Sequence, residues 1–236
     1  MAVGDVPGWN RSIGFHLYTL WLFTRSDIKT AVLPQLAFAI SAVTSARIVS
    51  TSSEEFSSIF FRLPHAIVWI WLNLLRFNVS NQRRPESVRE DALNKPWRPL
   101  PSGRLSTDEA RWLDFILIPL APCVGYALCG FTPSLLFGAV CVMYNDFNHL
   151  NEQYFVVRNV LNGVGYALLN WGTTVALAGV SSFDLTGLGW SWLAITAAIT
   201  LTTIHLQDLP DIAGDRARGR RTMPMVLGEM PTRVSG

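Results

Sequence analysis

Three long runs of this sequence contain no Asp, Glu, Lys or Arg: residues 115–145, 159–183 and 185–207. A helix on the surface of a soluble protein carries charged residues on its water-facing side, so runs this bare are incompatible with that setting. The apolar core of a bilayer is roughly 30 Å thick and takes about 20 apolar residues per helix. The runs therefore predict an integral membrane protein with an all-α fold, a polytopic bundle of transmembrane helices.

The breaks between apolar stretches predict about six spans. The run 115–145 is too long for one ordinary span, and the residues from Gly130 to Pro133 supply turn chemistry in its middle. An eleven-residue apolar stretch at 14–24 better suits a helix in the membrane interface. The predicted spans are 30–46, 56–75, roughly 112–130, 133–147, 159–180 and 188–206.

The basic residues support this span count. Six spans place the N-terminus, the 76–111 segment, the 146–158 loop and the 207–236 tail on one side of the membrane. Of the 19 Lys and Arg residues, only Arg47 and Arg62 then lie on the other side. The positive-inside rule makes the basic side cytosolic, in a eukaryotic cell at the endoplasmic reticulum. We expect one transmembrane domain over 1–236, with segments 76–111 and 207–236 facing each other at its cytosolic mouth.

The segment after the last span, QDLPDIAGDRARGRR, carries three aspartates at helical spacing. Asp208, Asp211 and Asp215 would stack on one face if the last span continued as a helix. Stacked carboxylates repel unless cations lie between them, and Mg²⁺ is usually held by one or two carboxylates, phosphate oxygens and water. Four nearby arginines offer planar donors suited to phosphate: Arg216, Arg218, Arg220 and Arg221. A solvated loop that fixes topology or contacts anionic lipid explains this segment equally well.

The segment after the second span is also rich in acidic and amide side chains. Glu86 and Glu90 are four residues apart and share a helical face, and Pro85 predicts that a helix begins or kinks there. The proline-rich tract that follows restricts the backbone, so we expect it to hold Lys95 and Arg98 in place. The candidate metal-binding residues of this segment are Asn81, Gln82, Glu86, Glu90 and Asp91.

The tracts DALNKPWRPLPSGRLS and QDLPDIAGDRARGRRTMPMVLG together resemble the two signature regions of the UbiA superfamily of intramembrane prenyltransferases. The resemblance extends from about Phe23 to the end of the chain. In that family an Asn/Asp-rich motif after the second helix and a DxxDxxxD motif after the sixth bind Mg²⁺ and an isoprenyl diphosphate. This chain departs from the first motif, because Arg83, Arg84 and Ser87 stand where acidic or amide residues are expected. The family has about nine helices, whereas this chain ends shortly after the second motif.

The altered first motif and the NKPWRPLPSGR tract are most similar to fungal members of the family that act as membrane-bound terpene cyclases. The resemblance implies that Asp208, Asp211 and Asp215 are catalytic and hold Mg²⁺ together with the first-segment candidates. It also implies that the diphosphate of farnesyl diphosphate is bound by basic residues, for which the candidates are Lys95, Arg98, Arg158 and Arg218. The expected partners are this substrate and the bilayer, with no nucleic acid.

A cyclase needs a pocket that folds its substrate and steadies positive charge, and aromatic faces do both. The candidate lining residues are Trp69, Trp71, Phe77, Tyr144, Tyr166 and Trp171. Two other functions stay open on sequence alone. One is transfer of a prenyl group to an aromatic acceptor, and the other is a non-enzymatic or inactive membrane protein.

Overall fold

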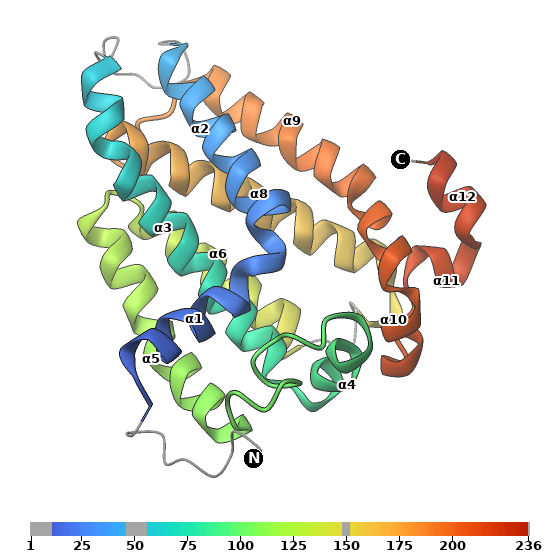
Figure 1. Cartoon of the computed structure of the whole chain (residues 1–236). Helices are drawn as coiled ribbons and strands as arrows, with labels where there is room; N and C mark the ends of the chain where they lie inside the picture. The colour runs from blue at the N-terminus through green and yellow to red at the C-terminus, as the bar shows by residue number, and fades with distance from the viewer. Residues whose placement is uncertain (1–10, 46–55, 148–151, 236) are drawn as a thin grey trace.

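A computed structural model describes residues 11–45, 56–147 and 152–235, and for residues 56–58 it describes the backbone alone. Every regular element in these ranges is helical (Figure 1). The elements are α1 (Ile13–Thr24), the short 3-10 turn η3 (Arg25–Asp27), the π turn η4 (Ile28–Val32), α2 (Leu33–Thr44), α3 (Phe56–Gln82), α4 (Pro85–Asn94), α5 (Thr107–Ala127), α6 (Phe131–Asn145), α8 (Phe155–Ala178), α9 (Gly187–Thr203), the 3-10 helix η5 (Ile204–Asp211), α10 (Ile212–Arg218), α11 (Met223–Leu227) and α12 (Glu229–Val234).

The all-α prediction is confirmed for the described residues, and each of the six predicted spans falls on a helix. The predicted break near Gly130 separates α5 from α6, and Pro85 occupies the first turn of α4. The second predicted span ends at Leu75, but α3 continues to Gln82 because the sequence offers no helix breaker before Pro85. Arg47, predicted to lie on the opposite side of the membrane, falls outside the described residues.

α8 forms the centre of the bundle and packs against α2, α3, α6 and α9 (Figure 1). The Trp69 side chain of α3 is fully buried, and its Nε1 donates a hydrogen bond to the Gly130 carbonyl oxygen at 3.0 Å. The indole also lies over Gly172 of α8, where an added Cβ would approach the ring to 1.9 Å. Glycine at 172 therefore allows α3 and α8 to approach closely enough to enclose this tryptophan.

By length and apolar content, one helical stretch of the described chain is sufficient to cross a bilayer on its own, and it covers 187–218. α6 is apolar but shorter. The longer helices α3 and α8 contain amide side chains that lower their apolar content, and Asn73 and Asn170 face other helices rather than the outside. The outer surface is apolar, with Trp112, Phe115 and Ile195 among its exposed residues. Such a surface is typical of helices that face lipid.

Candidate active site

The segments that follow α3 and α9 meet at one end of the bundle, where α10 packs against α4 (Figure 1). Gly214 makes this contact possible. A Cβ added at Gly214 would lie 2.2 Å from Nδ2 of Asn94 and 2.8 Å from Cγ of Glu90. Because no larger residue fits, the glycine of the IAGD sequence sets how closely the two acidic segments approach.

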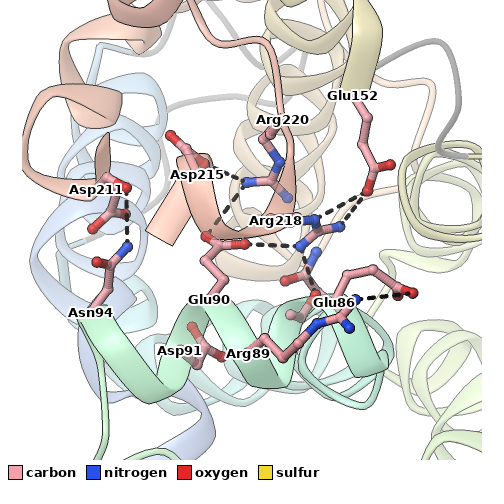
Figure 2. A network of polar contacts seen from close by, with 12 residues as sticks. Glu86, Arg89, Glu90, Asp91, Asn94, Glu152, Asp211, Asp215, Arg218 and Arg220 are labelled. Carbon is pink, nitrogen blue, oxygen red and sulfur yellow. Dashed lines mark hydrogen bonds and ion pairs between the residues drawn. The ribbon is translucent and has the colours of Figure 1, made fainter. Parts of the chain in front are cut away.

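Glu90 of α4 is the acidic residue that joins the two segments (Figure 2). Its carboxylate pairs with Arg218 at 3.0 Å and with Arg220 at 3.5 Å. Arg220 also pairs with Asp215 at 3.2 Å, so a chain of ion pairs connects Glu90 to the second segment. The other side of Arg218 is held by Glu152, at 2.9 Å.

A glycine at the end of α10 directs both arginines toward Glu90. Gly219 has φ of +78° and caps the helix in the left-handed conformation, which glycine adopts without steric cost. The chain therefore reverses between Arg218 and Arg220, and the Arg220 amide N–H donates back to the Asp215 carbonyl at 3.0 Å. Arg216 stays exposed. Of the arginines that the sequence offered for phosphate, Arg218 and Arg220 lie inside the cluster.

The remaining aspartates of the second segment also meet cations. Asp211 accepts from the Lys95 Nζ at 2.8 Å, and its backbone carbonyl accepts from Asn94. Asp208 is 2% exposed and forms a two-pronged pair with Arg158, in which Nη1 lies 2.8 Å from Oδ2. The three carboxylates do not stack as the spacing predicts, since the chain tightens into η5 around Pro210 and each turns to a different partner.

Most of the first-segment candidates lie apart from this cluster. Asn81 donates to Asn145 at 2.9 Å, and Gln82 is fully buried and donates to the Phe23 carbonyl at 3.0 Å. Glu86 is partly exposed, beside Arg89 of its own helix. Asp91 is buried and pairs with Arg98 at 2.7 Å. The structure thus brings Glu90 to the second segment, whereas Asn81 and Gln82 contact α6 and α1, and Glu86 and Asp91 pair within their own segment.

The surroundings set the acidity of these carboxyl groups. Burial raises the pKa of Asp215 to about 6, against the opposing effect of Arg220. Burial also acts to raise the pKa of Glu90, but Arg220 and Arg218 outweigh it and hold that pKa below its ordinary value. For Asp91 burial prevails over the pairing with Arg98, and the pKa is raised. Glu90 is therefore held ionised, while Asp215 is a carboxyl group short of compensating positive charge.

The donor chemistry of this cluster fits a hard divalent cation. Within the described ranges, no three Asp, Glu, His or Cys side chains converge on one point as a metal cage. Oδ2 of Asp215 is buried and accepts no hydrogen bond from these residues, so one carboxylate oxygen is available to a cation. Mg²⁺ needs only one or two protein carboxylates when phosphate oxygens and water complete its shell.

A largely apolar cavity of about 800 Å³, its open mouth included, adjoins the charged cluster. Asp208 and Arg158 form part of its wall, and Arg158 Nε donates to the Tyr144 hydroxyl at 3.2 Å. Of the six aromatic candidates, Phe77, Tyr144 and Tyr166 line this cavity. The other three are tryptophans whose ring N–H groups donate hydrogen bonds within the bundle. Trp69 donates to the Gly130 carbonyl, Trp71 to the Thr24 hydroxyl and Trp171 to the Ser182 carbonyl.

Two acidic residues of the candidate site lie outside both sequence motifs, so the sequence alone could not identify them. Glu152 belongs to the 146–158 loop and pairs with Arg218. The sequence predicted only that this loop lies on the same side of the membrane as the two acidic segments. Asp27 lines the cavity and accepts from Asn78 Nδ2 at 2.8 Å, and burial raises its pKa. It belongs to the turn before the first predicted span, where a single aspartate gives no signal.

Comparison with known proteins finds relatives of this chain. The sequence profile described as the UbiA prenyltransferase family matches residues 38–235. Fumagillin beta-trans-bergamotene synthase of Aspergillus fumigatus is 32% identical over 235 residues, which are 100% of this chain and 73% of that protein. Somaliensene A/B synthase of Streptomyces somaliensis is 31% identical over 226 residues, which are 95% of this chain and 70% of that protein.

Among solved structures, one chain matches with a TM-score of 0.59 at 18% identity. The match covers 93% of this chain and 72% of that one. It comes from work on digeranylgeranylglyceryl phosphate synthase in membranes. At this identity the likeness shows a shared fold.

Proposed function

Because this chain belongs to the UbiA prenyltransferase family, we propose that it is a membrane-bound terpene cyclase that ionises farnesyl diphosphate with Mg²⁺ and cyclises it to a sesquiterpene hydrocarbon. Two relatives at 31% and 32% identity are named as synthases of terpene products, which supports a cyclase over other activities in the family. A bergamotene-like product is the first to look for, given the name of the 32% identical relative.

The observation that carries this proposal is the position of the apolar cavity. Its wall includes Asp208 and Arg158, so a hydrocarbon chain inside it would have its diphosphate end at the charged cluster. Phe77 and Tyr144 pack together with ring centroids 5.4 Å apart on that wall. Each aromatic face stabilises a cation by about 0.5 to 2 kcal/mol. These rings could therefore stabilise a carbocation as its charge migrates along the chain.

The basic residues differ in how readily they could meet a diphosphate. Arg158 lines the cavity, and the Lys95 side chain is about one-fifth exposed. Arg218 and Arg98 do not line the cavity, are less exposed than Lys95, and pair with Glu90 and Asp91 respectively. We therefore assign Arg158 and Lys95 to direct contact with the leaving diphosphate, and Arg218 and Arg98 to positioning the carboxylates around it.

The residues that would hold Mg²⁺ are Asp208, Asp211 and Asp215, with Glu90 from the first segment. When bound, the ion would help to neutralise the charge on the departing diphosphate. Asp215 is suited to this role because its Oδ2 is buried without a hydrogen-bond partner among the described residues. A bound substrate that fills the cavity would displace water, which strengthens each of these electrostatic contacts and protects the carbocation from capture.

We further propose that the bundle crosses the membrane with six spans and presents the charged cluster to the cytosol. The single domain 1–236 then delivers an apolar substrate from the bilayer into the cavity and leaves its diphosphate at the aqueous face. The exposed apolar residues on α5 and α9 support this placement.

Membranes that contain the protein, incubated with farnesyl diphosphate and Mg²⁺ but no acceptor, test the proposal. We expect a cyclic hydrocarbon in the organic extract by gas chromatography and mass spectrometry. EDTA should abolish it and added Mg²⁺ should restore it. Absence of any cyclic product, with the protein present and folded in the membrane, contradicts the cyclase assignment.

One feature of the cavity favours transfer to an aromatic acceptor instead. Asp27 and Gln207 place polar groups on its wall, and these could orient the hydroxyl of a second substrate. If product forms only when an aromatic acceptor is added, and carries both the prenyl group and the acceptor, the protein is a prenyltransferase.

A further inference from the structure

A second cavity is lined by other residues of α3 than the apolar one, and the two share no lining residue. It has a volume of about 620 Å³, its open part included, and is enclosed by α3, α5 and α6. Its lining contains three arginines, Arg76, Arg83 and Arg111, and two aspartates, Asp114 and Asp146. The function proposed above uses none of these residues.

Arg76 is the unusual member of this group. It is 7% exposed, yet its guanidinium makes no hydrogen bond or ion pair with any described residue. It lies directly against α6 at Gly138, where an added Cβ would come within 2.0 Å of Nη1. Its charge acts on the nearby Asp114 carboxylate, but that carboxylate pairs directly with Arg83, so the Arg76 guanidinium is open to an anion from outside the chain.

The two aspartates of the cavity are already engaged by other cations. Arg83 pairs with Asp114 at 2.7 Å and with Asp146 at 3.2 Å. Arg84 adds a further contact to Asp146 at 3.3 Å. Arg111 pairs with Asp108 on the surface, at 3.3 Å. Among the described residues, Arg76 is therefore a positive charge in excess of the acidic groups that line the cavity.

The outer rim of the cavity is apolar. Phe115 and Ile118 of α5 and Val142 of α6 line it, and all three are substantially exposed on the outer surface of the bundle. An anionic group that enters at this rim with hydrocarbon attached would find apolar contacts outside and a guanidinium within. Arginine presents planar N–H donors that match phosphate oxygens.

We propose that this cavity binds a phosphate group, with Arg76 as its principal donor. The phosphate can come from the headgroup of an anionic phospholipid or from free inorganic phosphate, and the apolar rim favours the lipid. The proposal is independent of the terpene cyclase assignment, since it concerns other residues and another cavity.

Binding to the detergent-purified full chain tests this, with phosphatidylglycerol and inorganic phosphate as separate probes and native mass spectrometry or a thermal shift as the readout. Arg76→Gln should weaken binding of at least one probe by roughly tenfold or more, as expected when a charge-assisted hydrogen bond is lost. Arg76→Lys should restore part of it. Arg233→Gln is the matched control, because it removes an exposed arginine from α12.

A second variant guards against a folding defect in Arg76→Gln. Ser80 is one helical turn after Arg76 and lines the same cavity, so Ser80→Asp supplies an internal partner for the guanidinium. It should keep the fold and lose the phosphate. Loss of phosphatidylglycerol binding alone identifies a lipid site, and loss of inorganic phosphate binding identifies a soluble ion. Wild-type affinity for both probes in Arg76→Gln and Ser80→Asp overturns the proposal.

Discussion

In the second acidic segment, all three aspartates pair with basic side chains at the charged end of the bundle. In the first segment, Glu90 pairs with basic side chains there, and most of the other polar residues make contacts elsewhere. Gln82 bonds to the backbone before η3, and Asp91 secures the turn that contains Arg98. Both segments carry acidic and basic residues, but they differ in where those residues make their contacts. We infer that the second supplies most of the site and that the first mainly holds α4 in place against it.

The largest expected effects come from the second segment. Asp208→Ala and Asp215→Ala should each lower turnover by at least about 100-fold, the scale on which loss of one electrostatic group affects an enclosed reaction. The measurement is hydrocarbon formation from farnesyl diphosphate in membranes with equal amounts of inserted protein. Near wild-type activity in either variant contradicts the placement of the site.

Glu90 and Glu86 provide a sharper comparison within α4. Glu90→Gln should lower turnover by about tenfold or more, because it leaves Arg218 and Arg220 without their shared buried partner. Glu86→Gln should change it by less than about twofold, since Glu86 is partly exposed and its contact with Arg89 is long. Equal losses in the two variants would mean that both glutamates serve the site, as the sequence motif suggested.

Gly214→Ala tests whether the close approach of α10 to α4 matters. The added methyl group would overlap the side chains of Asn94 and Glu90, so these must shift or the helices separate, at a cost of about 1 to 3 kcal/mol in stability. We expect a lower melting temperature and a several-fold loss of turnover. Gly187→Ala is the control, because nothing lies within 4 Å of a Cβ at that position. If both variants melt like the wild type, the contact is looser than the structure indicates.

The helices of this fold follow directly from local sequence, and the site follows only in part. Uncharged runs and the break near Gly130 locate α5 and α6, and Pro85 marks the start of α4. Spacing alone could not separate Glu90 from Glu86, because the face of α4 that meets α10 is set by the fit around Gly214. Glu152 is equally hidden, since its pairing with Arg218 joins residues 66 positions apart.

The environment of Arg76 is a second feature that the sequence did not predict. A span that ended at Leu75 would have left Arg76 in a solvated loop, where an arginine needs no partner. Because α3 continues to Gln82, Arg76 is packed between helices instead, and the absence of an ion pair between Arg76 and any described residue becomes informative. Whether Arg76 is solvated or buried depends on where α3 ends, and the apolar content of the sequence does not predict that position.

We propose that both acidic segments serve one diphosphate at the mouth of the apolar cavity. A crystal structure with Mg²⁺ and a farnesyl diphosphate analogue that resists ionisation tests it most directly. We predict the diphosphate beside Asp208, Arg158 and Lys95, within reach of the cluster around Glu90, and the farnesyl chain along Phe77 and Tyr166. A diphosphate bound elsewhere, or in contact with the second segment while α4 has moved away, would contradict the account.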